Sequence, residues 1–505
     1  MLPAWRTHKD PCFANGRSVT LPSPLELGVG AAPVPNQKEI HLMRPTICRL
    51  ALVAAALGLL LAPASASAVA TAVQIEEAIG KGVTYLKGQQ KEGGEMPSFG
   101  GDWALTSLAA AGVASADVNK AGKEGKDARS WYEGVVGVPT WPGEGAVATD
   151  FERAALVSYA AGIDPARVSK RQNLIAKIAS YYQPESPGYY GSTFNGTVFG
   201  LIALAKLKTT GGVLRVPQIV LDQAVEAVKA NQHTDGGWTW EKAAGNEEAL
   251  KKASEPDMTG AAMAALCSAG VVKTNATIES ARKYLESIFE GSSGAFKSTF
   301  GNNTSSDAWA VAGLKACGID PQGTEFQGPA PNRKTPINFL ISQQVTGGGF
   351  RYLTSGSTAD FYSSQDAVRA LGSGNFTATP PIPSGGAPQW KGVTQFATGE
   401  AETTSLALIV NNGSSPLKIC SVTLAPKATS TTLATVLNAA VAGTTPASCV
   451  TGYLPASGEG AITQVNGFPA TPAERWKVSI DGAALSTAKR NTAINVGDTI
   501  YLKYE

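Results

Sequence analysis

Apolar residues recur with a helical period along most of the chain and alternate with polar residues near its C-terminal end. In "ARKYLESIFEGSSGAF", Tyr284, Leu285, Ile288 and Phe289 fall on one helical face. In "SLALIVNN", "WKVSIDG" and "DTIYLKY", Val, Thr and Ile alternate with polar residues, which is typical of strands. "TTLATVLNAAV", between them, has helical spacing. The pattern predicts a helical region followed by a small α+β, β-rich region.

The helical region repeats one unit, in which an amphipathic helix, a turn with glycine and an aromatic residue, and a helix of small residues follow one another. "AVEAVKANQHTDGGWTW" with "DMTGAAMAALCSAG", and "PINFLISQQVTGGGFRY" with "SSQDAVRALGSG", are two copies. Most copies end in a glycine, and the period is about 50 residues: Gly112, Gly162, Gly270, Gly318, Gly372. We therefore expect six helical hairpins over residues 74–376, with the small-residue helices forming the inner of two concentric layers.

The turn "NQHTDGGWTW" contains His233, the only histidine after residue 41. Glycines allow turn conformations that other residues resist, so a structural role is predicted for the turn. His233 has no equivalent in the other copies, which favours a structural or solvated histidine over a catalytic one. The predicted turn residues of two copies are Gln232, Gly236, Gly237 and Trp238, and Gln343, Gly349 and Phe350.

This turn resembles the glutamine-tryptophan repeat of squalene and oxidosqualene cyclases, through "QHTDGGW" and the Phe-bearing copy "QQVTGGGF". Six such hairpins resemble the all-α α6/α6 toroid of terpenoid cyclases, protein prenyltransferase β subunits, complement thioester domains and cobalamin carriers. The resemblance implies the fold and is nearly silent on function.

The reactions of these families depend on motifs that this sequence lacks. It has no Asp-x-Asp-Asp acid motif, no zinc ligand set and no Cys-Gly-Glu-Gln thioester stretch. "PDMTGAA" resembles the Asp-Cys-Thr-Ala stretch of oxidosqualene cyclases, which would make Asp257 a general acid. The alternative is helix capping, because acidic or amide residues recur near the start of each second helix: Asp102, Asp150, Asn195, Asp257, Asp307, Asp366.

The C-terminal region resembles the small domain of the transcobalamin and intrinsic factor family, through "GYLPASGEGAITQVNG", "ERWKVSIDG" and "VGDTIYLKY". In that family a toroid precedes the small domain and the ligand lies between them. The resemblance implies cobalamin or another corrinoid as a ligand, without a required cofactor. Candidate ligand-binding residues are Tyr453, Trp476, Asp257, Asp307 and Trp309.

The N-terminal region of the chain predicts export. "LALVAAALGLLLAPASASA" follows Arg44 and Arg49 and has the layout of a secretory signal peptide, with cleavage after Ala66 or Ala68. We expect a misannotated extension (1–42), a signal peptide (43–68), the toroid (74–376), a Pro/Gly-rich linker (377–398) and the β-rich domain (399–505). The protein is then secreted or extracytoplasmic, and bacterial.

Charge and cysteine content narrow the expected partners. With 42 basic and 40 acidic residues, the chain has no net field for nucleic acid or an anionic membrane, and no membrane-embedded segment is expected. Export permits disulfides. We expect Cys420 to pair with Cys449, and Cys267 and Cys317 end equivalent helices and can pair as well.

Three functions remain open from the sequence. The first is an exported, non-catalytic protein that binds a small molecule between toroid and β domain. The second is a terpenoid cyclase-like enzyme that uses Asp257. The third is a platform for a protein or glycan at the cell envelope. The sequence fixes neither the ligand nor the oligomeric state.

Overall fold

The computed structural model describes most of the chain after residue 68. The described residues are 69–97, 100–138, 141–169, 172–206, 214–376, 378, 380–386, 391–392, 404–413, 416–424, 431–455, 460–471, 473, 475–486 and 489–505. They belong to one compact unit, Ala68–Glu505. The expected extension (1–42), the signal peptide (43–68) and part of the linker (377–398) lie outside them. Within the described part, none of the helices has the length and apolar character that crossing a bilayer requires.

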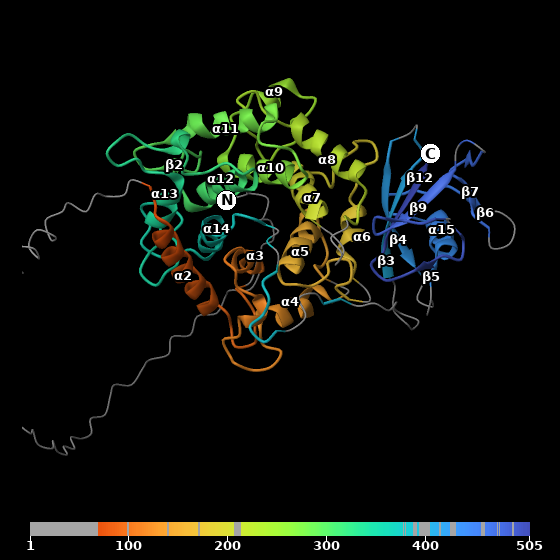
Figure 1. Ribbon diagram of the computed structural model, residues 1–505, viewed down its shortest axis with the longest axis horizontal. Helices are drawn as coiled ribbons and strands as arrows, with labels where there is room; N and C mark the ends of the chain where they lie inside the picture. The colour runs from red at the N-terminus through yellow and green to blue at the C-terminus, as the bar shows by residue number, and fades with distance from the viewer. Residues whose placement is uncertain are drawn as a thin grey trace, which may run out of the picture. The chain divides into compact units, whose positions relative to one another are not determined.

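Six helical hairpins follow one another in the described helical region (Figure 1). The first helices of the hairpins are α2 (Ala72–Gly88), α4 (Ala128–Val136), α6 (Leu174–Ala179), α8 (Gln218–Ala230), α11 (Ala276–Ile288) and α13 (Pro336–Ser342). The second helices are α3 (Trp103–Ala110), α5 (Ala148–Ala160), α7 (Phe194–Lys206), α10 (Pro256–Ser268), α12 (Thr304–Ala316) and α14 (Phe361–Leu371). A short helix, α9 (Glu247–Leu250), lies in the loop between α8 and α10.

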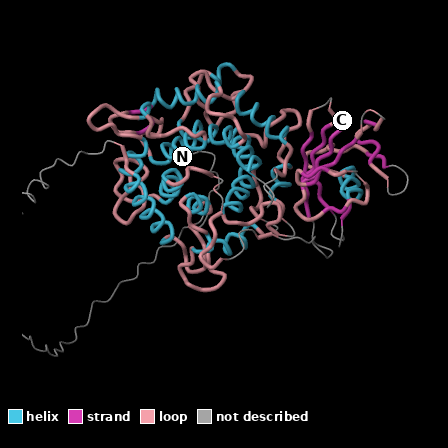
Figure 2. Tube along the Cα trace, viewed as in Figure 1, coloured by secondary structure: helices cyan, strands magenta, loops and turns pink. Residues whose placement is uncertain are grey.

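The second helices form a closed inner ring (Figures 1 and 2). Each contacts the next in the order α3, α5, α7, α10, α12 and α14, and α14 contacts α3. Small residues allow this approach, since a Cβ on Gly313 of α12 would lie 2.4 Å from the carbonyl oxygen of Gly260 in α10. The first helices pack outside the ring; α8 contacts α7 and α10, and α2 contacts α13 and α14. The predicted α6/α6 toroid is confirmed.

Aromatic side chains fill the centre of the ring. Phe199 of α7 packs against Trp309 of α12 with centroids 5.7 Å apart, although these helices are not neighbours in the ring. Trp309 also stacks on Phe376 at 4.5 Å and meets Trp103 of α3 at 6.4 Å. The buried guanidinium of Arg369 lies 4.7 Å from the Trp309 centroid and 4.2 Å from that of Phe376. The interior is therefore a packed core with a buried cation–π cluster.

A glycine with positive φ occupies the same place in five of the hairpin turns. A Cβ at each would lie 2.2 to 2.9 Å from a backbone oxygen in or just before a neighbouring first helix. Only glycine fits both the conformation and the contact. The five glycines are Gly94 (φ 100°), Gly188 (88°), Gly236 (97°), Gly294 (85°) and Gly348 (89°).

In two copies, a turn glutamine joins the turn to the next hairpin around the ring. Nε2 of Gln232 donates to the carbonyls of Gly236 and Thr277, both at 2.8 Å. Gln344, not the predicted Gln343, makes the same pair of bonds, to Gly348 at 2.9 Å and Ala78 at 2.8 Å. The equivalent glutamine lies six residues before the aromatic residue in both copies.

The other predicted turn residues are closely packed. Trp238 and Phe350 have no exposed surface. A Cβ on Gly237 would lie 2.5 Å from that of Ser254, and one on Gly349 would lie 2.6 Å from that of Ala359. His233 is buried, and its Nδ1 lies 2.7 Å from the carbonyl oxygen of Lys252. The motif is therefore part of the scaffold.

The C-terminal region is a small β-rich fold with one helix (Figure 2). Its main sheet has the order β10-β9-β12-β3-β4, in which β12 (Thr499–Tyr504) pairs parallel with β3 (Thr404–Asn411). β4 (Lys418–Leu424), β9 (Trp476–Ile480) and β10 (Ala483–Ala484) complete it. Helix α15 (Leu433–Ala442) packs on β4. The smaller strands are β5 (Thr431–Thr432) with β11 (Ala493–Ile494), and β6 (Tyr453–Pro455), β7 (Ile462–Val465) and β8 (Phe468–Pro469).

Both expected cysteine pairs are bonded. Cys267 at the end of α10 is joined to Cys317 at the end of α12, with a Cα–Cα distance of 5.2 Å. Cys420 of β4 is joined to Cys449 at 6.2 Å. The first bond links neighbouring inner helices, and the second closes the core of the β-rich region.

Candidate functional site

The β-rich region lies directly against one hairpin of the toroid, and we call this contact the seam. Helix α6 contacts β3 and β4. Nδ2 of Asn173, at the start of α6, donates to the carbonyl of Ser405 at 3.1 Å. The hydroxyl of Tyr182, just after α6, donates to the carbonyl of Leu417 at 3.0 Å. The third hairpin of the toroid therefore packs directly against the β-rich region.

One end of the seam is held by a charge cluster of two arginines and three aspartates. Nη2 of Arg215 lies 2.6 Å from Asp164, and its Nη1 lies 3.2 Å from Asp481 in the β-rich region. Arg167 contacts Asp164 at 3.1 Å and Asp498 at 3.2 Å. Burial raises the pKa of Asp498 to about 6, although a hydrogen bond from the backbone of Asn495 and both arginines oppose this shift.

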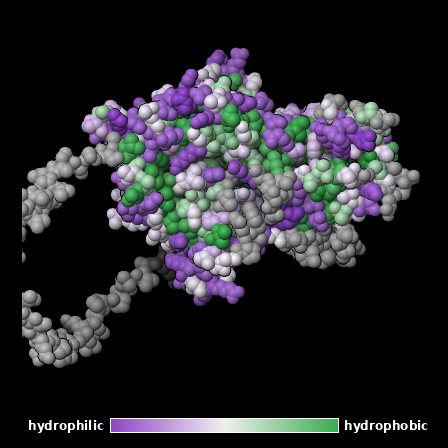
Figure 3. Space-filling view, in the orientation of Figure 1, coloured by the Kyte–Doolittle hydropathy of each residue, from purple (hydrophilic) through white to green (hydrophobic). Residues whose placement is uncertain are grey.

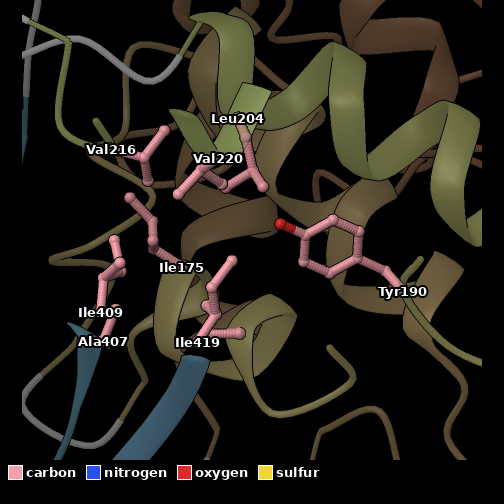
Figure 4. Close-up of a pocket in the computed structure, with 9 residues that line it drawn as sticks. Ile175, Tyr190, Leu204, Val216, Val220, Ala407, Ile409 and Ile419 are labelled. Atoms are coloured by element: carbon pink, nitrogen blue, oxygen red, sulfur yellow. The ribbon is translucent and has the colours of Figure 1, made fainter. Parts of the chain in front are cut away.

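An apolar cavity lies elsewhere in the seam (Figure 4). Its volume is about 240 Å³ when the space at its mouth is counted, and its enclosed part has room for about one water. Its lining comes from both regions: Ile175, Ala179, Tyr190, Leu204, Val216 and Val220 of the toroid, and Ala407, Ile409 and Ile419 of the β-rich region.

The hydroxyl of Tyr190 points into this cavity (Figure 4). Tyr190 is fully buried, and its hydroxyl has no hydrogen-bond partner among the described residues. Burial raises the pKa of Tyr190 well above its ordinary value, so the group stays protonated near neutral pH. It is the one polar side chain of the cavity lining.

The third hairpin departs from the repeat at the two positions that face the seam. Tyr182 occupies the position that Gln232 and Gln344 occupy in two other copies. In each of the three turns, the residue that follows donates its backbone N–H to the carbonyl of the residue just before the aromatic one. Tyr190 corresponds to Trp238, whose Nε1 donates to the carbonyl of Val228 at 2.9 Å. Thus two tyrosines replace a turn glutamine and a satisfied tryptophan, and each directs its hydroxyl toward the β-rich region.

The predicted site residues on the toroid lie in the inner ring and do not line the cavity. Asp257 is buried in the first turn of α10, where its Oδ1 accepts from the backbone N–H of Met258 at 2.7 Å. Burial raises the pKa of Asp257. Asp307 is fully buried in α12, with Oδ1 3.1 Å from the backbone nitrogen of Phe296, and burial raises its pKa strongly. Trp309 belongs to the aromatic core.

The predicted residues of the β-rich region lie in or against its own core. Trp476 is buried and donates from Nε1 to the carbonyl of Phe468 at 2.9 Å. The hydroxyl of Tyr453 lies 2.8 Å from Oδ1 of Asn438 on α15. Neither residue lines the cavity, so the structure does not bring the five candidates together there.

The capping explanation does not hold for four of the six recurring acidic or amide residues. Asp102 makes no side-chain cap bond to α3, and Oδ1 of Asn195 has no hydrogen-bond partner among the described residues; the other two are Asp307 and Asp366. The side chains that cap α12 and α14 belong to Asn303 and Asp360. Asp307 lies in the first turn of α12, and Asp366 lies in the middle of α14, where Arg369 pairs with it at 2.6 Å. Sequence spacing places these residues near helix starts but does not distinguish a cap from an inward-facing position.

The inter-region cavity does not fit a corrinoid. A corrinoid carries several amide groups and a cobalt ion, whereas the lining offers eight apolar side chains and one hydroxyl. Its enclosed space, with room for about one water, is also far below the roughly 300 to 1,000 Å³ of ordinary small-molecule sites. The described residues contain no cluster of side chains that could hold a metal ion.

Comparisons with known proteins give structural likenesses only. No family model matches the chain, and no curated protein matches it. Haptocorrin in complex with Cbi is 11% identical over 86% of this chain and 97% of that chain, with a TM-score of 0.33. The type II terpene cyclase MstE from Scytonema is 15% identical over 60% of this chain and 98% of that chain, with a TM-score of 0.41.

A third neighbour is protein geranylgeranyltransferase-I of Candida albicans complexed with GGPP. It is 16% identical over 38% of this chain and 52% of that chain, with a TM-score of 0.25. The three neighbours are of the kinds that the sequence resembles. All three TM-scores are below 0.5, so neither a ligand nor a reaction follows from them.

Proposed function

We propose that this protein is exported and binds a small molecule between its toroid and its β-rich region. The observation that carries the proposal is the buried, unpaired hydroxyl of Tyr190, which points into a cavity that both regions line. A buried hydroxyl without a partner costs about 1 to 3 kcal/mol, and a ligand that bonds to it would remove this cost. Sites for small molecules also form preferentially where two regions meet.

The retention of a ligand from source-cell extract tests this proposal. Purified full-length protein is incubated with extract, washed, and the retained molecules are identified by mass spectrometry. The variant Ala407→Leu, which fills the cavity from β3, should lose the retained molecule. Ala483→Leu, at an exposed position of β10, should keep it. Equal retention by both variants would place binding elsewhere.

The export part of the proposal rests on the apolar run before residue 68 and is compatible with the two disulfides. We propose the mature protein to comprise the toroid (74–376), the linker (377–398) and the β-rich domain (399–505). N-terminal sequencing of protein secreted by a bacterial host should give "SAVATAVQ" or "VATAVQ" as the first residues. Retention in the cytoplasm with an intact Met43 would contradict export.

The cyclase alternative is disfavoured by the core of the ring. A cyclase that used Asp257 would need an open cavity for its substrate, whereas Trp103, Phe199, Trp309 and Phe376 meet across the centre.

A function as an interaction platform would be favoured by a broad apolar patch on the surface. On the face that Figure 3 shows, hydrophobic residues lie in small groups among hydrophilic ones.

A further inference from the structure

We infer that the charge cluster at one end of the seam is a pH-sensitive clasp, which holds the β-rich region on the toroid more tightly in mild acid than at neutral pH. This inference rests on the proposed function, because it describes how the same seam is controlled. It requires the seam to open while the toroid and the β-rich region both stay folded.

The two regions have separate cores, which allows such an opening. The hydrophobic cluster of the β-rich region consists of residues between Leu406 and Leu502, and the inner helices of the toroid close their own ring. Relative motion is the default between regions with their own cores, unless a large apolar interface joins them. The seam combines an apolar stretch around the cavity with polar bonds from Asn173, Tyr182 and the charge cluster.

Charge is divided unequally across the cluster. The toroid contributes Arg167, Arg215 and Asp164, and the β-rich region contributes Asp481 and Asp498. When all five groups are ionised, three negative charges face two positive charges, so the closed seam encloses one negative charge in excess. An unbalanced buried charge is unfavourable, and one bound proton removes the imbalance.

Asp498 is the carboxyl that takes up this proton. Its side chain is 5% exposed, with Oδ2 2.7 Å from the backbone nitrogen of Asn495 and Oδ1 3.2 Å from Arg167. Asp164 and Asp481 each contact both arginines, so their charges are better compensated. Burial raises the pKa of Asp498 to about 6, and Asp481 adds to this shift, whereas the backbone of Asn495 and both arginines oppose it.

Opening the seam exposes Asp498, and its pKa then returns toward the ordinary value of 3.8. The closed seam therefore binds the proton more tightly than the open seam. Its stability relative to the open seam is fully present below about pH 4 and is lost as the pH rises through 6. With the whole shift assigned to the seam, the population of the open seam rises by about 10-fold from pH 5 to pH 7.

Thiol labelling of the full-length protein measures the opening. Ala407→Cys places a thiol in the seam, where Ala407 is 1% exposed and lines the cavity. Cys12→Ser and Cys48→Ser remove the two cysteines that lie outside the disulfides. The reagent is 4,4′-dithiodipyridine, and each rate is divided by that of the exposed thiol in Ala483→Cys at the same pH. This ratio cancels the intrinsic pH dependence of thiol reactivity.

Two core thiols and two carboxyl variants serve as controls. Ala262→Cys in α10 and Ala440→Cys in α15 are buried in the cores of the two regions and report unfolding. We expect the thiol of Ala407→Cys to react faster than both, with a relative rate that rises by up to about 10-fold from pH 5 to pH 7. Asp498→Asn should remove this rise, and Asp222→Asn, at an exposed position of α8, should keep it.

Two glycines of the β-rich region test the contact without a change of charge. A Cβ on Gly497 would lie 2.4 Å from Cγ of Arg167, whereas one on Gly467 would meet nothing within 4 Å. Both have positive φ, 78° and 84° for Gly497 and Gly467, so the backbone cost of alanine is similar. Gly497→Ala should raise the rate at Ala407→Cys by about 5-fold or more at both pH values, and Gly467→Ala should leave it within about twofold.

The outcomes separate this inference from the proposed function, because no ligand is present during labelling. An equal rate at pH 5 and pH 7, or an unchanged rise in Asp498→Asn, overturns the clasp. A rate at Ala407→Cys no higher than at the core thiols also overturns it, since the seam then opens only on unfolding. If the seam opens as expected but no molecule is retained from extract, the proposed function fails and the clasp stands. If a molecule is retained without a pH-dependent opening, the clasp fails and the proposed function stands.

Discussion

Trp238 shows how much one turn residue contributes to the toroid. Its ring is fully buried, its backbone nitrogen lies 3.1 Å from the Thr259 hydroxyl, and its Nε1 bonds to Val228. Trp238→Ala should lower the free energy of unfolding by roughly 3 to 5 kcal/mol, measured by urea denaturation. Trp240→Ala is the control, because that ring is 39% exposed, and a comparable loss there would contradict the structural role of the motif.

His233 is a second residue whose contribution can be measured. The sequence left open whether His233 is structural or solvated, and the side chain is buried and contacts the carbonyl of Lys252. His233→Ala should therefore cost about 1 to 3 kcal/mol, since the carbonyl loses its partner. Ligand retention by the folded variant should be unchanged. A selective loss of retention would give His233 a functional role.

At single positions, the sequence predicted the type of contact better than the residue that makes it. Of two adjacent glutamines, Gln343 was the predicted turn residue, whereas Gln344 makes the bonds that join the turn to the next hairpin. The sequence did not single out Tyr190. The cavity that Tyr190 lines is completed by β3 and β4, which lie more than 200 residues further along the chain, so no local pattern could reveal this position. The departure from the repeat was the available signal.

Two adjacent glycines in the last turn test how the ring closes between its last and first hairpins. A Cβ on Gly348 would lie 2.5 Å from the carbonyl oxygen of Lys81 in α2, whereas one on Gly347 would meet nothing within 4 Å. Both have positive φ, 95° and 89° for Gly347 and Gly348. Gly347→Ala should cost about 1 kcal/mol from backbone conformation, and Gly348→Ala should cost clearly more. Equal losses in thermal unfolding would show that α2 does not close the ring tightly.

The disulfide between Cys420 and Cys449 is the corresponding test for the β-rich region. It closes a loop with a sequence separation of 29, for which loop entropy gives about 3 to 4 kcal/mol. The variant Cys420→Ala/Cys449→Ala should lose a comparable amount in urea denaturation. Mass mapping of the secreted wild-type protein should find both thiols oxidised, and two free thiols would contradict the bond.

At the level of elements, the period and the alternation of apolar residues were sufficient to predict the hairpins and strands. A helix with one apolar face packs in the outer layer. A helix with small residues packs in the inner layer, where Gly260 and Gly313 allow α10 and α12 to approach closely. The inward polar positions were less predictable. Asp366 pairs with Arg369 inside the ring, and both residues would suit an exposed helix surface equally well from spacing alone.

At the scale of the whole molecule, the pH dependence of stability reports on the seam. Burial raises the pKa of Asp498 from 3.8 to about 6, so the folded protein binds this proton more tightly than the unfolded chain. The resulting stabilisation is fully present below about pH 4 and is lost as the pH rises through 6. Arg167, Arg215, Asp164 and Asp481 surround the group.

The variant Asp498→Asn removes this titration and keeps a side chain of similar shape. The free energy of unfolding of the wild type, measured relative to the variant, should therefore rise as the pH falls from 7 to 4, by up to roughly 2 to 3 kcal/mol. Urea denaturation at several pH values measures the difference. Asp498 bonds to Arg167 across the seam at 3.2 Å, so this titration acts on the contact between the two regions. A difference that stays constant with pH would mean that the carboxyl of Asp498 is not buried in the seam, and the toroid and the β-rich region would then meet in another way.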